Sequence, residues 1–185
     1  LGGYAFSPKF EARSNAGKAD AGFRNSIAAG VVLGNDMYKR WGGEFRYLYR
    51  PGAAELESNG QKFSFASRQH LIHYDMLWYA ADRGARMRPY FAFGAGIKFV
   101  QGVGTEKAFQ PLGQYAILTK TSQVLPLVDV GGGVKYRFGA TGVFRVEGRY
   151  YLSPAADEVI SPLPGGSVKG WMHDFIPMIG IGLTW

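Results

Sequence analysis

The chain lacks cysteine entirely, so its 185 residues can build neither a disulfide framework nor a thiolate metal site. No apolar run approaches the ~18 to 20 residues that a transmembrane helix requires. No charged-then-apolar leader begins at Leu1, so we expect a mature chain from which a signal peptide has been removed. These absences argue against a disulfide-stapled module and a helical membrane protein, and the length favours a single domain spanning residues 1–185.

Residue types that carry catalysis are also sparse. The three histidines, His70, His73 and His173, show no HxxxH or HExxH spacing, and no His–Asp–Ser set can be placed near one rim. The glycine-rich segments 102–107 and 130–139 lack both the GxxxxGK[ST] pattern and a following helix. The sequence therefore predicts a protein that is not an enzyme, with no catalytic residue, no metal ligand and no cofactor.

Basic residues are in excess, since 21 Lys and Arg against 14 Asp and Glu give a net charge of +7. They are scattered along the chain rather than clustered, and no arginine-rich run, zinc-ligand spacing or RNP-like motif accompanies them. We therefore expect no nucleic-acid partner.

Glycine, at 27 residues, and aromatic residues, at 15%, are abundant, and they recur with a period of two. Charged and aromatic side chains alternate strictly in GEFRYLYR (43–50), and FRVEGRYYL (144–152) is a near copy. A period of two bounded by Gly, Pro, Asn and Asp is typical of β-strands. The pattern predicts eight strands, at about 3–13, 22–34, 37–50, 63–80, 87–102, 121–138, 142–153 and 171–185.

The segments between these strands alternate in length without exception. Three tight turns, at 34–36, 81–85 and 139–142, separate four longer polar links, at 14–21, 51–62, 103–120 and 154–170. Short turns at one end and long loops at the other are typical of barrels in the bacterial outer membrane. The sequence thus predicts an all-β fold, an eight-stranded antiparallel up-and-down transmembrane β-barrel with short periplasmic turns and long extracellular loops.

The orientation of the two strand faces follows from the last strand and from the glycines. The bulky apolar face of the last strand carries Ile179, Ile181 and Leu183, whereas Gly180 and Gly182 lie on its other face. The interior of an eight-stranded barrel is just wide enough for side chains, so glycines interleaved with long charged residues fit inside it. This phase predicts a luminal set of charged and histidine residues: Lys9, Glu11, Arg24, Arg40, Glu44, Arg46, His73, Asp75, Lys98, Asp129, Lys135, Arg145, Glu147, Arg149 and Asp174.

Aromatic residues collect near both ends of the outward faces. Any one of them is compatible with an ordinary core, but two girdles are typical of the two membrane interfaces. The expected lipid-interface aromatics are Trp41, Trp78, Tyr136, Phe138 and Trp185 toward the short turns, and Tyr47, Tyr49, Phe99, Tyr150 and Trp171 toward the long loops.

One strand changes phase along its length. Its apolar positions are odd at Phe63 and Phe65 but even from Ile72 to Trp78. Either a β-bulge near 67–69 or a strand that extends beyond the membrane would account for the change.

The whole chain resembles the small eight-stranded outer-membrane barrels of the OmpA/OmpX-like group. The resemblance lies in RPYFAFGAGI (88–97), in the two E-x-R strands quoted above, and in the closing MIGIGLTW (178–185), which is similar to the signal read by the barrel-assembly machinery. That family usually ends in Phe rather than Trp. The resemblance implies a bacterial outer-membrane location, contact with outer-membrane lipids and lipopolysaccharide, and variable surface loops.

In the best-known members a luminal Glu–Arg set controls weak conductance, and the residues of that type here are Glu44, Arg46, Glu147 and Arg149. Some relatives modify lipid A, but their rim His/Ser arrangement has no counterpart in this sequence. Some members also carry a peptidoglycan-binding domain, and we expect none in this protein.

We therefore expect a non-enzymatic outer-membrane barrel whose lumen is plugged by ion pairs. Its structural or surface-interaction role would depend on the loops 51–62, 103–120 and 154–170, where a protein partner or a larger envelope complex could dock. The alternative is a narrow pore for ions or small solutes, including apolar ones. A soluble lipocalin-like carrier is disfavoured by the charged, glycine-lined narrow face.

Overall fold

The computed structural model describes residues 1–15, 17–106 and 109–184. The described residues contain no helix that could span a membrane. These described residues form thirteen strands: β1 (Gly2–Ala5), β2 (Phe10–Ser14), β3 (Gly17–Phe23), β4 (Ser26–Asp36), β5 (Trp41–Ser58), β6 (Gln61–Tyr79), β7 (Met87–Gly102), β8 (Ala116–Leu118), β9 (Ser122–Phe138), β10 (Gly142–Pro154), β11 (Ile160–Pro162), β12 (Ser167–Val168) and β13 (Trp171–Leu183).

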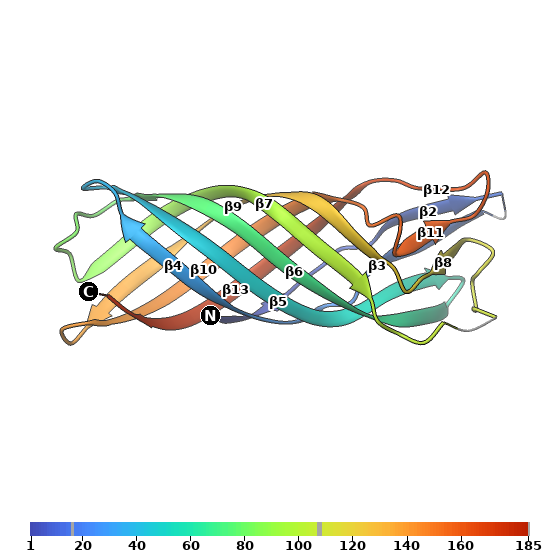
Figure 1. The fold of residues 1–185 in the computed structure, drawn as a ribbon, viewed down its shortest axis with the longest axis horizontal. Helices are drawn as coiled ribbons and strands as arrows, with labels where there is room; N and C mark the ends of the chain where they lie inside the picture. The colour runs from blue at the N-terminus through green and yellow to red at the C-terminus, as the bar shows by residue number, and fades with distance from the viewer. Residues whose placement is uncertain (16, 107–108, 185) are drawn as a thin grey trace.

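The all-β antiparallel fold is as predicted, and eight of the strands follow one another in a ring of hydrogen-bonded pairs. The hydrogen-bonded order runs β4, β1, β13, β10, β9, β7, β6 and β5. Since β5 pairs with β4 on one edge and with β6 on the other, the order returns to its start. The result is an elongated cylinder of strongly tilted strands, with short turns at one end and the strands β2, β3, β8, β11 and β12 at the other (Figure 1).

The first two predicted strands are each broken in two. The barrel contains only β1 and β4, whereas β2 and β3 belong to an extension beyond it. The guanidinium of Arg50 lies at both breaks, donating to the Ser7 hydroxyl at 2.7 Å and the Arg24 carbonyl at 2.9 Å. It also donates to the Ser26 hydroxyl at 2.9 Å. A buried arginine with several donors thus satisfies the polar groups that the broken ladder exposes.

Two of the four predicted long loops are strands, so that prediction is wrong for 14–21 and 51–62. The β5–β6 hairpin continues to Ser58 and Gln61, joined through Asn59 and Gly60. Both turn residues have positive φ, 49° and 77°, which is the geometry of a tight hairpin turn. The polar composition of these segments resembles a loop, but Ala54 and Leu56 are fully buried between polar neighbours. The alternation therefore continues past the barrel, and only its outward residues are polar.

No β-bulge causes the change of phase in β6. The β5–β6 register is continuous from Trp41↔Trp78 to Ser58↔Gln61, which rules out an inserted residue. Odd-numbered β6 residues point inward throughout, but their character changes from His73 and Asp75 to Phe65. The outer wall of the barrel carries exposed apolar and aromatic side chains such as Phe45, Tyr74 and Phe91, and we call this surface the apolar band. The β6 strand continues past this band, and there its polar and apolar faces are exchanged.

The extension has its own apolar interior, as a water-soluble barrel would. Segments of the predicted loops 103–120 and 154–170 fold into it, and β8 pairs with β11 across its mouth. We call residues 110–120 and 156–162 the lid. The side-chain amide of Gln110 fixes the lid by bonding both the N–H and the carbonyl of Leu118, at 2.9 and 2.8 Å. The buried core comprises Ala12, Ala19, Ala21, Phe23, Ala54, Leu56, Phe65, Val100, Leu112, Tyr115, Ala116, Leu118, Leu125, Ala155, Ala156, Val159, Ile160, Val168 and Met172.

Candidate functional site

A cluster of charged side chains fills the lumen in the half of the barrel nearer the short turns. Its members come from β5, β6, β9 and β10, because alternate residues of each strand point inward. Most are almost fully buried, so their charges depend on one another rather than on water. The charged lumen, as we call it, comprises Glu44, Arg46, His73, Asp75, Asp129, Lys135, Arg145, Glu147 and Arg149.

Arg46 lies at the centre of this cluster. Its guanidinium contacts both carboxylate oxygens of Glu147, at 2.5 and 3.1 Å. It also lies 3.0 Å from Glu44 and 3.2 Å from Asp75. The flat guanidinium has five donors in a fixed plane, which is the geometry needed to hold three carboxylates at once.

Arg149 and Arg145 complete the network on either side. Arg149 contacts Asp129 at 2.9 Å and Asp75 at 3.0 Å. Arg145 contacts Glu44 at 3.0 Å and Glu147 at 3.2 Å.

Lys135 adds a contact of 2.6 Å to Glu44. Apart from His73, the cluster therefore contains four basic and four acidic side chains, so their formal charges balance. The strand pairing determines these contacts, and the sequence could not predict them.

His73 and two carboxylates bring three possible metal-ligating atoms within 4.8 Å of one another. Nδ1 of His73 lies 2.7 Å from Asp75 and 3.2 Å from Asp129. However, Arg149 contacts both carboxylates, and Arg46 contacts Asp75. A divalent cation here would be held against two guanidinium groups, so the donor set does not fit a metal ion.

Above the charged lumen the interior becomes apolar and then polar again. The apolar layer comprises Ala5, Ala28, Leu48, Leu71, Leu127, Tyr151, Ile176 and Met178.

Beyond this layer Asp174 bridges Lys98 and Arg50, each at 2.7 Å. Further still is the apolar core beneath the lid. The interior is therefore filled at several successive levels rather than at one.

Four residues of the predicted luminal set lie elsewhere. Lys9 pairs with Glu57, and Arg24 pairs with Glu55, on the outside of the extension. There the hydrogen bond from Lys9 lowers the pKa of Glu57.

Glu11 forms exposed pairs with Arg13 and Lys18, and Arg40 pairs with Asp82 in the short turns. The phase assignment was wrong for these four because they lie outside the part of each strand that encloses the charged lumen. Arg50 shares the parity of Glu44 and Arg46 in GEFRYLYR, and it too is buried inside the molecule.

The predicted interface aromatics point outward. Trp41, Trp78 and Trp171 are 39%, 41% and 53% exposed. Tyr47 and Tyr49 are half-buried against His70, and the Tyr47 hydroxyl lies 2.8 Å from His70 Nδ1. Trp185 lies outside the described residues. The other predicted aromatics among the exposed residues are Tyr136, Phe138 and Tyr150.

Glycines leave room for the network, as the glycine placement predicted. A Cβ on Gly133 would meet the side chain of Glu147 at 2.7 Å, whereas one on Gly182 would meet nothing within 4 Å. We expect Gly133→Ala to lower the free energy of unfolding by about 1–3 kcal/mol through overpacking. Gly182→Ala is the matched control and should change it by less than about 0.5 kcal/mol. Urea titrations of tryptophan fluorescence would test this, and equal losses in the two variants would contradict it.

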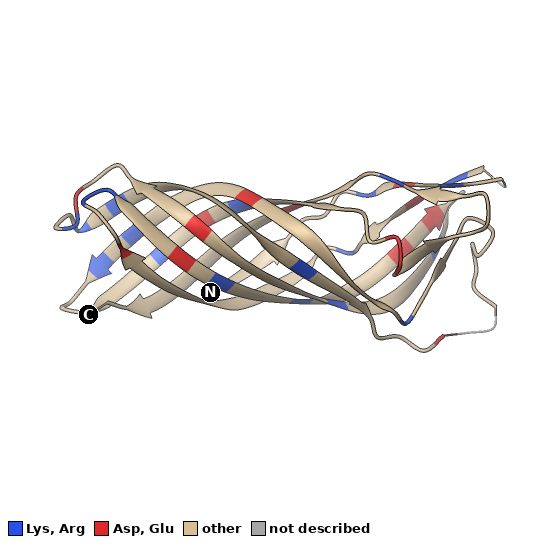
Figure 2. Cartoon of the chain, turned by 45° about the horizontal axis from the view of Figure 1, so that its top comes forward, with Lys and Arg blue, Asp and Glu red and all other residues tan. Residues whose placement is uncertain are grey.

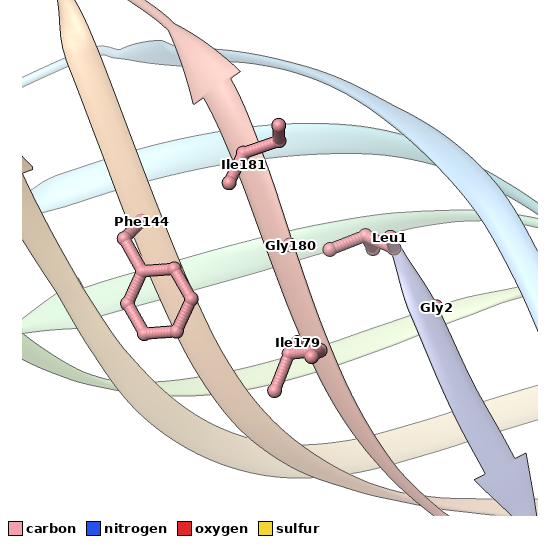
Figure 3. A pocket seen from close by; sticks show the side chains of 6 residues that line it. All are labelled: Leu1, Gly2, Phe144, Ile179, Gly180 and Ile181. Atoms are coloured by element: carbon pink, nitrogen blue, oxygen red, sulfur yellow. The ribbon is translucent and has the colours of Figure 1, made fainter.

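A shallow depression on the outer wall offers no chemistry. It lies where β1 meets β13, and its lining is Leu1, Gly2, Phe144, Ile179, Gly180 and Ile181 (Figure 3). None of these six side chains carries a titratable group.

Comparison with solved structures returns small barrels. Neisserial surface protein A (NspA) is 14% identical, with a TM-score of 0.49 over 97% of this chain and 94% of that one. The N-terminal β-barrel domain of Pseudomonas aeruginosa OprF is also 14% identical, with a TM-score of 0.40 over 98% of this chain and 95% of that domain. No family model and no curated protein sequence matches the chain.

Proposed function

We propose that the chain is a non-enzymatic integral protein of the bacterial outer membrane, with a closed lumen and a surface-interaction or structural role. The observation that carries the proposal is the exchange of polarity along β5 and β6. Near the short turns, Phe45 and Tyr74 are exposed while Arg46 and Asp75 are fully buried. Such an inverted arrangement is stable only where the outside is lipid rather than water.

The height of the apolar band fits a membrane. Twelve residue steps separate Trp171 from Leu183 on β13. At about 3.3 Å per step and a tilt of ~40°, they rise roughly 30 Å, close to the apolar band of about 25 Å in outer-membrane barrels. We infer that lipids, lipopolysaccharide among them, contact this band, and that the barrel-assembly machinery inserts the chain.

The filled interior favours a closed barrel rather than an open pore. Ions would have to separate the contacts of Arg46 and Arg149, pass an apolar layer and then displace the lid. Breaking buried ion pairs is costly, so passage by thermal fluctuation would be rare.

The extension and the lid would perform the proposed surface interaction, because they lie beyond the apolar band. There the side chain of Phe109 is 80% exposed, an apolar group that a protein partner or a larger envelope complex could cover.

Single-channel conductance measurements test whether the barrel is closed to ions. In planar bilayers we expect no steady single-channel current from refolded protein whose insertion is verified by heat-modifiable gel mobility. A steady current that Arg149→Ala enlarges or abolishes would instead make the lumen a gated path for ions or small solutes. A chain that stays soluble without detergent would contradict membrane insertion itself.

A further inference from the structure

The fold brings together, at one end of the barrel, basic residues that are scattered along the sequence. Six of them lie at the short-turn end, together with two acidic residues, Asp36 and Asp82, which leaves a net charge of +4 there. Figure 2 shows blue segments outnumbering red ones at this end. The six basic residues are Lys39, Arg40, Arg83, Arg86, Arg88 and Arg137.

The opposite end is close to neutral by comparison. Eight basic and seven acidic residues are described there, and many form exposed pairs such as Lys9–Glu57 and Arg24–Glu55. The charge of the molecule is therefore polarised along the barrel axis. These residues are Lys9, Arg13, Lys18, Arg24, Lys62, Arg68, Lys120 and Lys169, with Glu11, Asp20, Glu55, Glu57, Glu106, Asp157 and Glu158.

The basic residues of the short turns divide into two groups. Arg83 and Arg137 donate to backbone carbonyls and hold the turns, and Arg40 pairs with Asp82. Within the described part of the chain, Lys39 and Arg86 have no acidic side chain within ion-pair distance, and both are exposed. Their charges are free to meet an external anion.

These free charges lie beside the outward aromatics. The Arg86 guanidinium lies 5.9 Å from the ring centre of Tyr136. Lys39 precedes Trp41 by two residues, and Trp41 is opposite Trp78 across the β5–β6 pair. Amphipathic aromatics take up the headgroup level of a bilayer, so cations at their side face lipid phosphates.

We propose that this end of the barrel is a docking surface for the headgroups of anionic phospholipids in the leaflet that surrounds the short turns. The inference rests on the proposed membrane insertion. The aromatics favour lipid over a partner in the aqueous space, because the cations border the apolar band as well as the turn tips. The surface would select the surrounding lipid by charge and fix the depth of the barrel.

Tryptophan quenching by brominated lipids tests this surface. Trp171→Phe and Trp185→Phe leave Trp41 and Trp78 as reporters at the basic end. The protein is refolded into phosphatidylcholine vesicles that contain brominated phosphatidylglycerol or, at the same mole fraction, brominated phosphatidylcholine. At low salt we expect several-fold stronger association of phosphatidylglycerol, and at 0.5 M NaCl we expect this preference to fall as the charges are screened.

The matched variants isolate the two free cations. Lys39→Gln with Arg86→Gln should remove most of this several-fold preference, since each cation near an anionic surface contributes about fivefold in affinity. Lys120→Gln with Lys169→Gln makes the same change of net charge at the other end and should leave the preference intact. Equal quenching by both lipids in protein of verified insertion would overturn the docking surface. Failure of insertion, seen as the loss of heat-modifiable mobility, would overturn the proposed function instead.

Discussion

Arg46→Met should lower the free energy of unfolding by about 3–5 kcal/mol, because it leaves the carboxylates of Glu44, Asp75 and Glu147 without the cation that joins them. The Arg46 side chain is fully buried, so water cannot replace its contacts. Urea-induced unfolding in lipid vesicles, followed by tryptophan fluorescence, would measure the loss.

Two companion variants separate charge from packing. Arg24→Met removes an exposed arginine that pairs with Glu55, and its loss should stay below about 1 kcal/mol. Adding Glu147→Gln to Arg46→Met removes one carboxylate charge and restores the balance of acidic and basic groups in the charged lumen, so the double variant should be more stable than the sum of the single losses predicts. Strict additivity, or a loss below about 1 kcal/mol for Arg46→Met, would show that the network does not hold the barrel together.

The alternation of side chains was enough to predict the barrel wall and most of the charged lumen. In β10, Arg145, Glu147 and Arg149 point inward as their parity requires, because a strand has no other way to arrange its side chains. Which carboxylate each arginine contacts depends on the register of non-adjacent strands, and sequence parity carries no register. Contacts such as Arg46 with Glu147, 101 residues apart, therefore emerged only from the structure.

The sequence did not predict the extension, and the physical reason is different. Above the apolar band the outside must be polar, so the outward residues of 51–62 look like those of a loop. The inward residues that distinguish a strand there, Ala54 and Leu56, are few and small. The sequence also did not predict the excess of basic residues at the short-turn end. Lys39 and Arg86 are far apart in sequence, and only the turns of the barrel place them at the same end.

Leu118→Asp should open the lid without unfolding the barrel. Leu118 is fully buried in the core of the extension, paired in β8 with Ile160 of β11. An unpaired carboxylate there costs about 3 kcal/mol or more, which raises the open fraction of the lid roughly a hundredfold. Trypsin reports this opening through Lys120, because the flanking Thr119 and Thr121 hydroxyls donate to the Glu158 carbonyl at 2.6 and 2.8 Å and hold the site closed.

The neighbouring residue provides the control. Ile117→Asp adds the same charge one position away, where the side chain is 39% exposed, so cleavage should stay close to the wild-type rate. When opening and closing are fast relative to cleavage, the rate follows the population of the open form. Retained heat-modifiable mobility in Leu118→Asp would confine the opening to the lid, and Leu118→Ala, which adds no charge, should give a smaller increase in cleavage. Equal cleavage of the two aspartate variants would mean that the lid is already open in the native protein, and the barrel would then be closed by the charged lumen and the apolar layer alone.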